Sequence, residues 1–113
     1  VTSDEKIRAN PDQVRRMVRG FVKSLIYLHK EKARVAALIV KEWKIDLDLA
    51  QRSYQAMVKT LSPDGSASEE AIRKVIEQTL AATKKEKQIP LSQVADLTFL
   101  SKAHKELEIQ RRP

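Results

Sequence analysis

Apolar residues recur every three or four positions over one long stretch, and this pattern constrains the fold more than any other feature. The spacing places them on one side of an α-helix that runs to about residue 30. Asn10 is a favourable N-cap and Pro11 suits the first helical position, so we expect the helix to begin there. Gly20 inside it predicts a close approach by another backbone. The recurring residues are Val14, Met17, Val18, Phe21, Leu25, Leu28 and His29.

Helices are predicted on both sides of this long one. Thr2 is expected to cap a short helix that ends before Pro11, with Glu5 completing a capping box. Residues 32–44 form the next predicted helix. Its apolar residues cover a wide arc, so we expect burial on more than one side. The residues on that arc are Val35, Ala36, Leu38, Ile39, Val40 and Trp43.

Three further helices follow from their capping residues, which are Asp46, Ser68 and Asp96. The first carries Ala50, Tyr54, Met57, Val58 and Leu61 on its apolar face. The second carries Ala71, Ile72, Val75, Ile76, Thr79 and Leu80, and the third carries Leu97, Leu100, Ala103, His104 and Leu107. Residues 62–66, with Pro, Asp and Gly in succession, predict a turn. Residues 89–91 begin a short connecting segment.

Strand-forming runs of β-branched and aromatic residues are missing from the sequence. Aromatic residues make up 4% of the 113 residues, and no linker or internal repeat divides the chain. This is the length of a single domain. The sequence therefore predicts an all-α fold, with residues 1–113 forming one helical region.

Catalytic constellations are not found in the sequence. The chain has no cysteine, which excludes disulfides, thiolate zinc sites and cysteine nucleophiles. His29 and His104 lie at apolar-face spacing and are interpreted as packed side chains. The acid pairs Asp46/Asp48 and Glu69/Glu70 stand where helices begin, so capping explains them. We expect no enzymatic activity, no catalytic or metal-binding residues and no cofactor.

A basic face is the one candidate binding surface. The net charge is +7, and Arg15, Arg19 and Lys23 align at four-residue steps on the long helix. No aromatic residue stands among them to stack on bases, and no helix-turn-helix spacing is present. We therefore expect a solvated face that binds no nucleic acid. Contact with an acidic partner is the alternative.

The sequence predicts neither a membrane-spanning segment nor a signal peptide within the chain. No stretch is long and apolar enough to span a bilayer. Residues 1–8 are polar and precede no apolar segment, so they do not form a signal peptide. If the protein is exported, we expect its signal to lie upstream of Val1.

Several runs resemble the solute-binding proteins of ABC importers, in the nitrate, sulfonate, taurine and thiamine-precursor class. Residues 4–14 (DEKIRANPDQV) look like a stretch found late in those proteins, where an Asn-Pro pair opens a long helix. Residues 24–32 (SLIYLHKEK) are similar to the end of that helix. The helix of Tyr54, the Asp64–Gly65 turn, the helix from Ser68 and residues 96–100 (DLTFL) follow in the family's order.

The resemblance implies that the chain is about the last third of a protein with two α/β lobes joined by a hinge. Such a protein captures a small organic solute between its lobes and delivers it to an inner-membrane permease. It implies a periplasmic or lipid-anchored extracytoplasmic location. No ligand-binding motif of the family matches residues here, and Trp43 and Tyr54 are interpreted as packing residues.

Two further expectations concern partners. Without sheets to cover it, the apolar arc of residues 38–43 would lack a neighbour, so we expect the isolated chain to self-associate there as a symmetric dimer, with exchange of a helix between the chains as one form of it. The alternative to the transport reading is a free-standing helical interaction domain that binds an acidic protein or nucleic acid through Arg15, Arg19 and Lys23.

Overall fold

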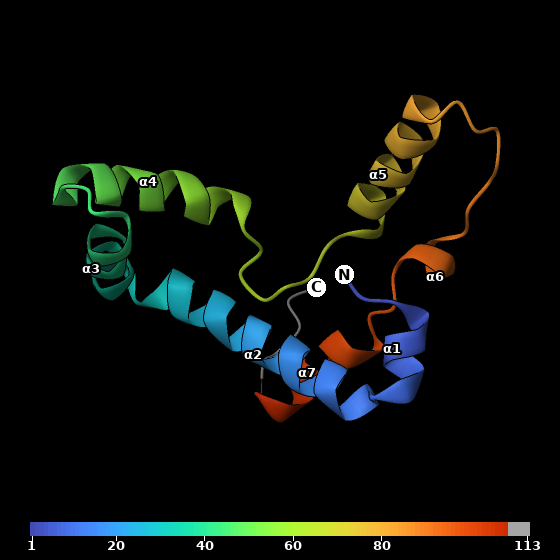
Figure 1. Ribbon diagram of the computed structural model, residues 1–113, viewed down its shortest axis with the longest axis horizontal. Coiled ribbons are helices and arrows are strands. Elements are labelled where there is room, and N and C mark those ends of the chain that lie inside the picture. Colours follow the sequence, from blue (N-terminus) through green and yellow to red (C-terminus); the bar gives the residue numbers. More distant parts are fainter. Residues whose placement is uncertain (109–113) are drawn as a thin grey trace.

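The computed structural model describes residues 1–108, and over this range the chain is helical, with no strand (Figure 1). The all-α prediction is confirmed for these residues. Several predicted boundaries differ by a residue, residues 91–94 form a one-turn helix, and the last helix begins at Thr98, one residue later than predicted. The helices are α1 (Asp4–Ala9), α2 (Pro11–Lys30), α3 (Lys32–Trp43), α4 (Leu47–Thr60), α5 (Glu69–Ala82), α6 (Leu91–Val94) and α7 (Thr98–Glu106).

The start of α2 matches the prediction. The Asn10 side chain accepts a hydrogen bond from the Gln13 backbone N–H at 3.2 Å, with Pro11 in the first turn. The predicted cap of α1 was wrong by one residue. The hydroxyl of Ser3, not Thr2, accepts from the Lys6 N–H at 3.1 Å, because the helix begins at Asp4.

The cap of α2 can be tested by substitution. Asn10→Ala should lower the free energy of unfolding by about 1 kcal/mol, because the Gln13 N–H loses its acceptor. Asn10→Ser keeps an acceptor and should be nearly neutral. Urea unfolding followed by circular dichroism distinguishes the two, and equal losses would contradict this start of the helix.

A tight reversal joins α3 and α4 into a hairpin. Lys44 adopts a left-handed conformation with φ of 55°, which ends α3 at Trp43, one residue earlier than predicted. The predicted cap Asp46 is confirmed, since its carboxylate accepts from the Leu49 N–H at 2.8 Å. The buried core of the hairpin consists of Val35, Ile39, Ala50 and Tyr54.

The prediction that α3 is buried on more than one side was wrong. Leu38 and Trp43 are 53% and 59% exposed. The reason is that α3 packs mainly on α4, with Leu28 of α2 against the same core. A wide apolar arc in a sequence shows which residues could be covered, but not whether a neighbour is present.

The second packing unit joins the two ends of the chain, since α7 lies along α2 (Figure 1). Val14, Val22 and Leu25 of α2 are buried, and Ala103 of α7 is fully buried. Asp96 is not the N-cap of α7, which is Leu97, although its carboxylate still accepts from the Thr98 N–H at 2.9 Å.

Helix α5 stands away from both units and packs on α6. Ser68 caps it as predicted, accepting from the Ala71 N–H at 3.1 Å. None of its predicted apolar face is buried, and Val75 is 60% exposed. The expected close approach at Gly20 is also wrong, because nothing lies within 4 Å of a Cβ built there.

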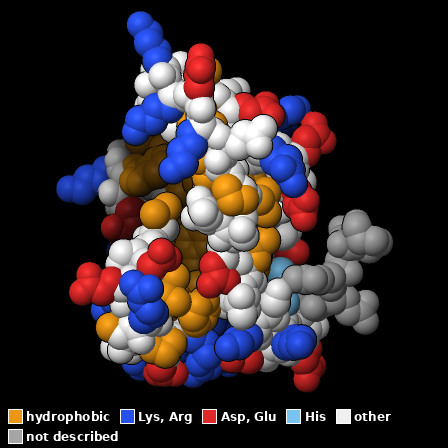
Figure 2. Space-filling model, turned by 90° about the vertical axis from the view of Figure 1, so that its right-hand side faces the viewer, with side chains coloured by type: hydrophobic (Ala, Val, Ile, Leu, Met, Phe, Trp, Pro, Cys, Tyr) orange, Lys and Arg blue, Asp and Glu red, His pale blue; other side chains and the backbone are white. Residues whose placement is uncertain are grey.

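The arrangement as a whole is open. The radius of gyration is 17.2 Å, against about 13 Å for a compact domain of this length. The accessible surface is 9276 Å², against roughly 6,300 Å² for a compact monomer of this mass. Figure 2 shows hydrophobic side chains at the bottom of a recess in one face, with charged side chains around it.

Candidate functional site

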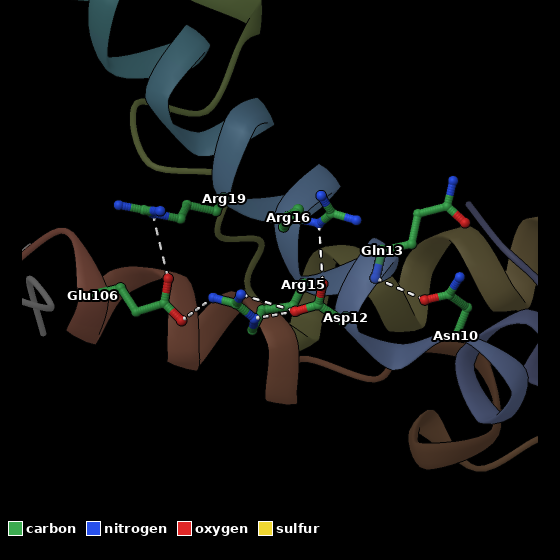
Figure 3. A network of polar contacts seen from close by, with 7 residues as sticks. All are labelled: Asn10, Asp12, Gln13, Arg15, Arg16, Arg19 and Glu106. Carbon is green, nitrogen blue, oxygen red and sulfur yellow. Dashed lines mark hydrogen bonds and ion pairs between the residues drawn. The ribbon is translucent and has the colours of Figure 1, made fainter.

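The predicted basic face is part of an ion-pair network that joins α2 to α7 (Figure 3). Arg15 Nη1 lies 2.9 Å from Glu106 Oε1, and Arg19 Nε lies 3.3 Å from Glu106 Oε2. One carboxylate on α7 therefore bridges two arginines that stand one turn apart on α2. Glu106 is 91 residues from Arg15 in sequence, which is why sequence spacing did not identify it.

Asp12 extends the network at the start of α2. Its Oδ1 accepts hydrogen bonds from Arg15 Nη2 at 2.9 Å and Nε at 3.2 Å, and its Oδ2 lies 3.1 Å from Arg16 Nε. The hydrogen bond from Arg15 lowers the pKa of Asp12, and the carboxylates of Asp12 and Glu106 raise the pKa of Arg15.

This geometry changes how the basic face is interpreted. Arg15 and Arg19 are held by carboxylates of the same chain, so an acidic partner would have to compete with Glu106 and Asp12. Of the three predicted residues, Lys23 is exposed and lies outside the network. The arrangement fixes how α7 lies on α2.

His104 is a packed side chain, as predicted. It is 4% exposed, and its Nε2 lies 2.8 Å from the backbone carbonyl oxygen of Asp64. Since a carbonyl only accepts, Nε2 carries the proton in this contact. The bond ties α7 to the turn at residues 62–66. His29 is half-buried on α2.

The turn itself is organised by Asp64. Its Oδ1 accepts from the Ser66 hydroxyl, from the Ser66 N–H at 3.0 Å and from the Ser62 hydroxyl at 3.2 Å. These bonds, with the Ser66 hydroxyl contributing most, hold the pKa of Asp64 below its ordinary value of 3.8. The electrostatic effect of His104 is the smallest cause that lowers the pKa of Asp64. The turn predicted from the sequence is confirmed.

The lowered pKa of Asp64 makes stability dependent on pH. The folded-state pKa lies below the unfolded value, so the contribution is present above pH 4 and is lost as pH falls through the folded pKa. Asp64→Asn should cost about 1 kcal/mol or less at pH 7, since the side chain is only half-buried. The difference in free energy of unfolding between the variant and the unchanged chain should therefore disappear as pH falls below about 4. Thermal unfolding of both proteins across pH 2–7 measures this difference, and a difference that stays constant with pH would contradict the role of the Asp64 carboxylate.

The remaining candidates separate into packing and capping roles. Tyr54 is 3% exposed, and its hydroxyl donates to the Leu28 carbonyl at 2.7 Å, so its packing role is confirmed. The packing role predicted for Trp43 was wrong, because the ring is largely exposed. The acids of the two predicted pairs do not form a joint site. Asp46 caps α4, and each of the other three forms an ion pair with a basic residue of its own helix. These pairs are Asp48–Arg52, Glu69–Arg73 and Glu70–Lys74.

Over residues 1–108, no three potential ligands among His, Cys, Asp and Glu gather in a way that could hold a metal ion. Within the same range, every helix is too short or too polar to cross a bilayer.

Comparisons with known proteins give no relative. No protein-family model, no curated protein and no solved structure matches the chain.

Proposed function

We propose that this chain is the helical C-terminal part of an extracytoplasmic solute-binding protein of an ABC importer, and that it has no catalytic activity of its own. The observation that carries the proposal is the uncovered apolar surface of the open array. Met17 and Phe21 on α2 are 70% and 64% exposed, although they belong to the apolar side of that helix.

The large exposed surface of the chain supports a neighbouring part of the protein that covers it. The chain exposes about 3,000 Å² more than a compact monomer of its mass would expose. Large apolar patches rarely stay in contact with water on soluble proteins. In the resembled family, helices of this kind pack against two α/β lobes, and such lobes would cover the open side of α2 and α5.

The proposal also draws on the features from which the resemblance was inferred. Asn10 caps a 20-residue helix that begins at Pro11, and Gly65 has a φ of 84° in the turn after Asp64. In the proposed protein, a small organic solute binds between the lobes, and its binding energy shifts a hinge equilibrium toward the closed form. The closed form then delivers the solute to the permease.

The alternative, an interaction domain for an acidic partner, has weaker support. Its binding face would consist of Arg15, Arg19 and Lys23, and Glu106 already engages the two arginines.

The proposal is tested on the native protein. An antibody raised against this chain should capture, from the cells that make it, a longer exported protein with α/β lobes. Mass spectrometry and cell fractionation provide the two readouts. A cytosolic product no longer than this chain would overturn the proposal.

Binding by the chain alone gives a further prediction. We expect no saturable heat in calorimetry against amino acids, sulfonates, pyrimidines and aromatic acids, because the lobes that would form the cleft are not among these helices. A micromolar dissociation constant for any of these solutes would contradict it.

A further inference from the structure

We infer that two copies of this chain associate as a symmetric dimer through the end of the α3–α4 hairpin, residues 41–52. This inference does not rest on the proposed function, since it concerns a surface at the far end of the hairpin from α7. Figure 1 shows that this end projects away from the rest of the molecule, where a second copy can approach without obstruction.

The hairpin end carries exposed apolar side chains close to one another in sequence. Trp43 ends α3, and Leu47 begins α4 only four residues later; they are 59% and 55% exposed. Trp43 follows Ile39 by four residues and Leu47 precedes Ala50 by three, so helical spacing places both on the core side of their helices. They lie beyond the core of Val35, Ile39, Ala50 and Tyr54, at the turn where the hairpin reverses.

Charge distinguishes this surface from the other exposed apolar patch. Met17 and Phe21 on α2 belong to the helix of the ion-pair network, where Arg15, Arg16, Arg19 and Lys23 outnumber the carboxylates Asp12 and Glu106. A second copy would therefore meet the same net charge there. In a symmetric dimer the same patch faces itself and must be self-complementary. The hairpin end has no net charge to oppose such contact, with three basic and three acidic residues: Lys41, Lys44, Arg52, Glu42, Asp46 and Asp48.

The chain as a whole exposes more surface than a stable dimer needs to bury. Specific interfaces bury about 1,200–2,000 Å² in total, and obligate ones more. Each copy exposes roughly 3,000 Å² more than a compact monomer. A dimer that removed about 800 Å² from each copy would use only part of this excess.

Sedimentation equilibrium and intrinsic fluorescence test the inference on the chain itself. We expect a dimer at high micromolar concentration. Trp43 is the only tryptophan, so dilution into monomer should shift its emission to longer wavelength. The double variant Trp43→Glu/Leu47→Glu should weaken association by at least about tenfold, as expected for a central aromatic anchor.

The matched control is Met17→Glu/Phe21→Glu, which places the same charges on the other exposed apolar patch and should leave dimerisation unchanged. Circular dichroism of each variant confirms that its helices are intact. A strictly monomeric chain at high micromolar concentration, with emission independent of dilution, would overturn the inference. So would a dimer that the α2 variant dissociates and the hairpin variant does not.

Discussion

Replacing Tyr54 by alanine should lower the free energy of unfolding by about 3–5 kcal/mol, the cost of removing a large buried ring. Tyr54 lies in the core between α3 and α4, where it is 3% exposed. The hairpin has few other contacts with the rest of the chain. A cavity at this position therefore has little surrounding structure to close it, and we expect the hairpin to unfold before the α2–α7 unit.

Tyr54→Phe separates the ring from its hydroxyl. The phenylalanine keeps the packing but leaves the Leu28 carbonyl without its 2.7 Å donor. We expect a loss of about 1 kcal/mol, typical of one neutral hydrogen bond.

Urea unfolding at one fixed protein concentration measures both variants. Trp43 fluorescence reports on the hairpin, and circular dichroism reports on all helices. If alanine cost no more than phenylalanine, the hairpin core would not be organised around this ring.

Local features of the fold could be predicted because they depend on residues a few positions apart. A cap needs only a polar side chain and the N–H three residues later. Asn10, Asp46 and Ser68 were therefore predicted correctly. Asp96 was predicted to be the N-cap of α7, but the N-cap is Leu97, so the helix begins one residue later than predicted. The Asp96 carboxylate accepts instead from the N–H of Thr98, two residues later.

Burial could not be predicted in the same way. Helical spacing assigned Phe21, Trp43 and Val75 to the apolar faces of helices, and each of them does lie in a helix. All three are nevertheless exposed, because periodicity shows a face without showing what covers it.

The ion-pair network shows the same limit for polar residues. Arg15 and Arg19 were recognised as one face from their four-residue spacing. Their common partner Glu106 lies at the other end of the chain, and only the packing of α7 on α2 brings it near. Sequence separation of this kind leaves no local pattern from which the pairing could be inferred.

The two glycines should respond to alanine in opposite directions. Gly65 has φ of 84° in the turn at residues 62–66, a region that costs other residues about 1–2 kcal/mol. A Cβ there would lie 3.3 Å from Leu100 Cδ1 and 3.6 Å from Leu25 Cδ1 and Val22 Cγ2. Gly65→Ala should therefore destabilise the chain by about 2 kcal/mol. The added methyl would press on the α2–α7 interface as well as strain the turn.

Gly20→Ala is the matched control. The substitution is the same, but here the backbone is helical and the space around an added Cβ is open. Gly20 has a helical backbone within α2, and a Cβ built there meets nothing within 4 Å. Alanine should stabilise the chain by about 0.5–1 kcal/mol by reducing the freedom of the unfolded state. Thermal unfolding of both variants measures the difference. A stabilised Gly65→Ala would mean that the turn does not hold its left-handed conformation against α2 and α7, and the contact from His104 to Asp64 would then lose its structural basis.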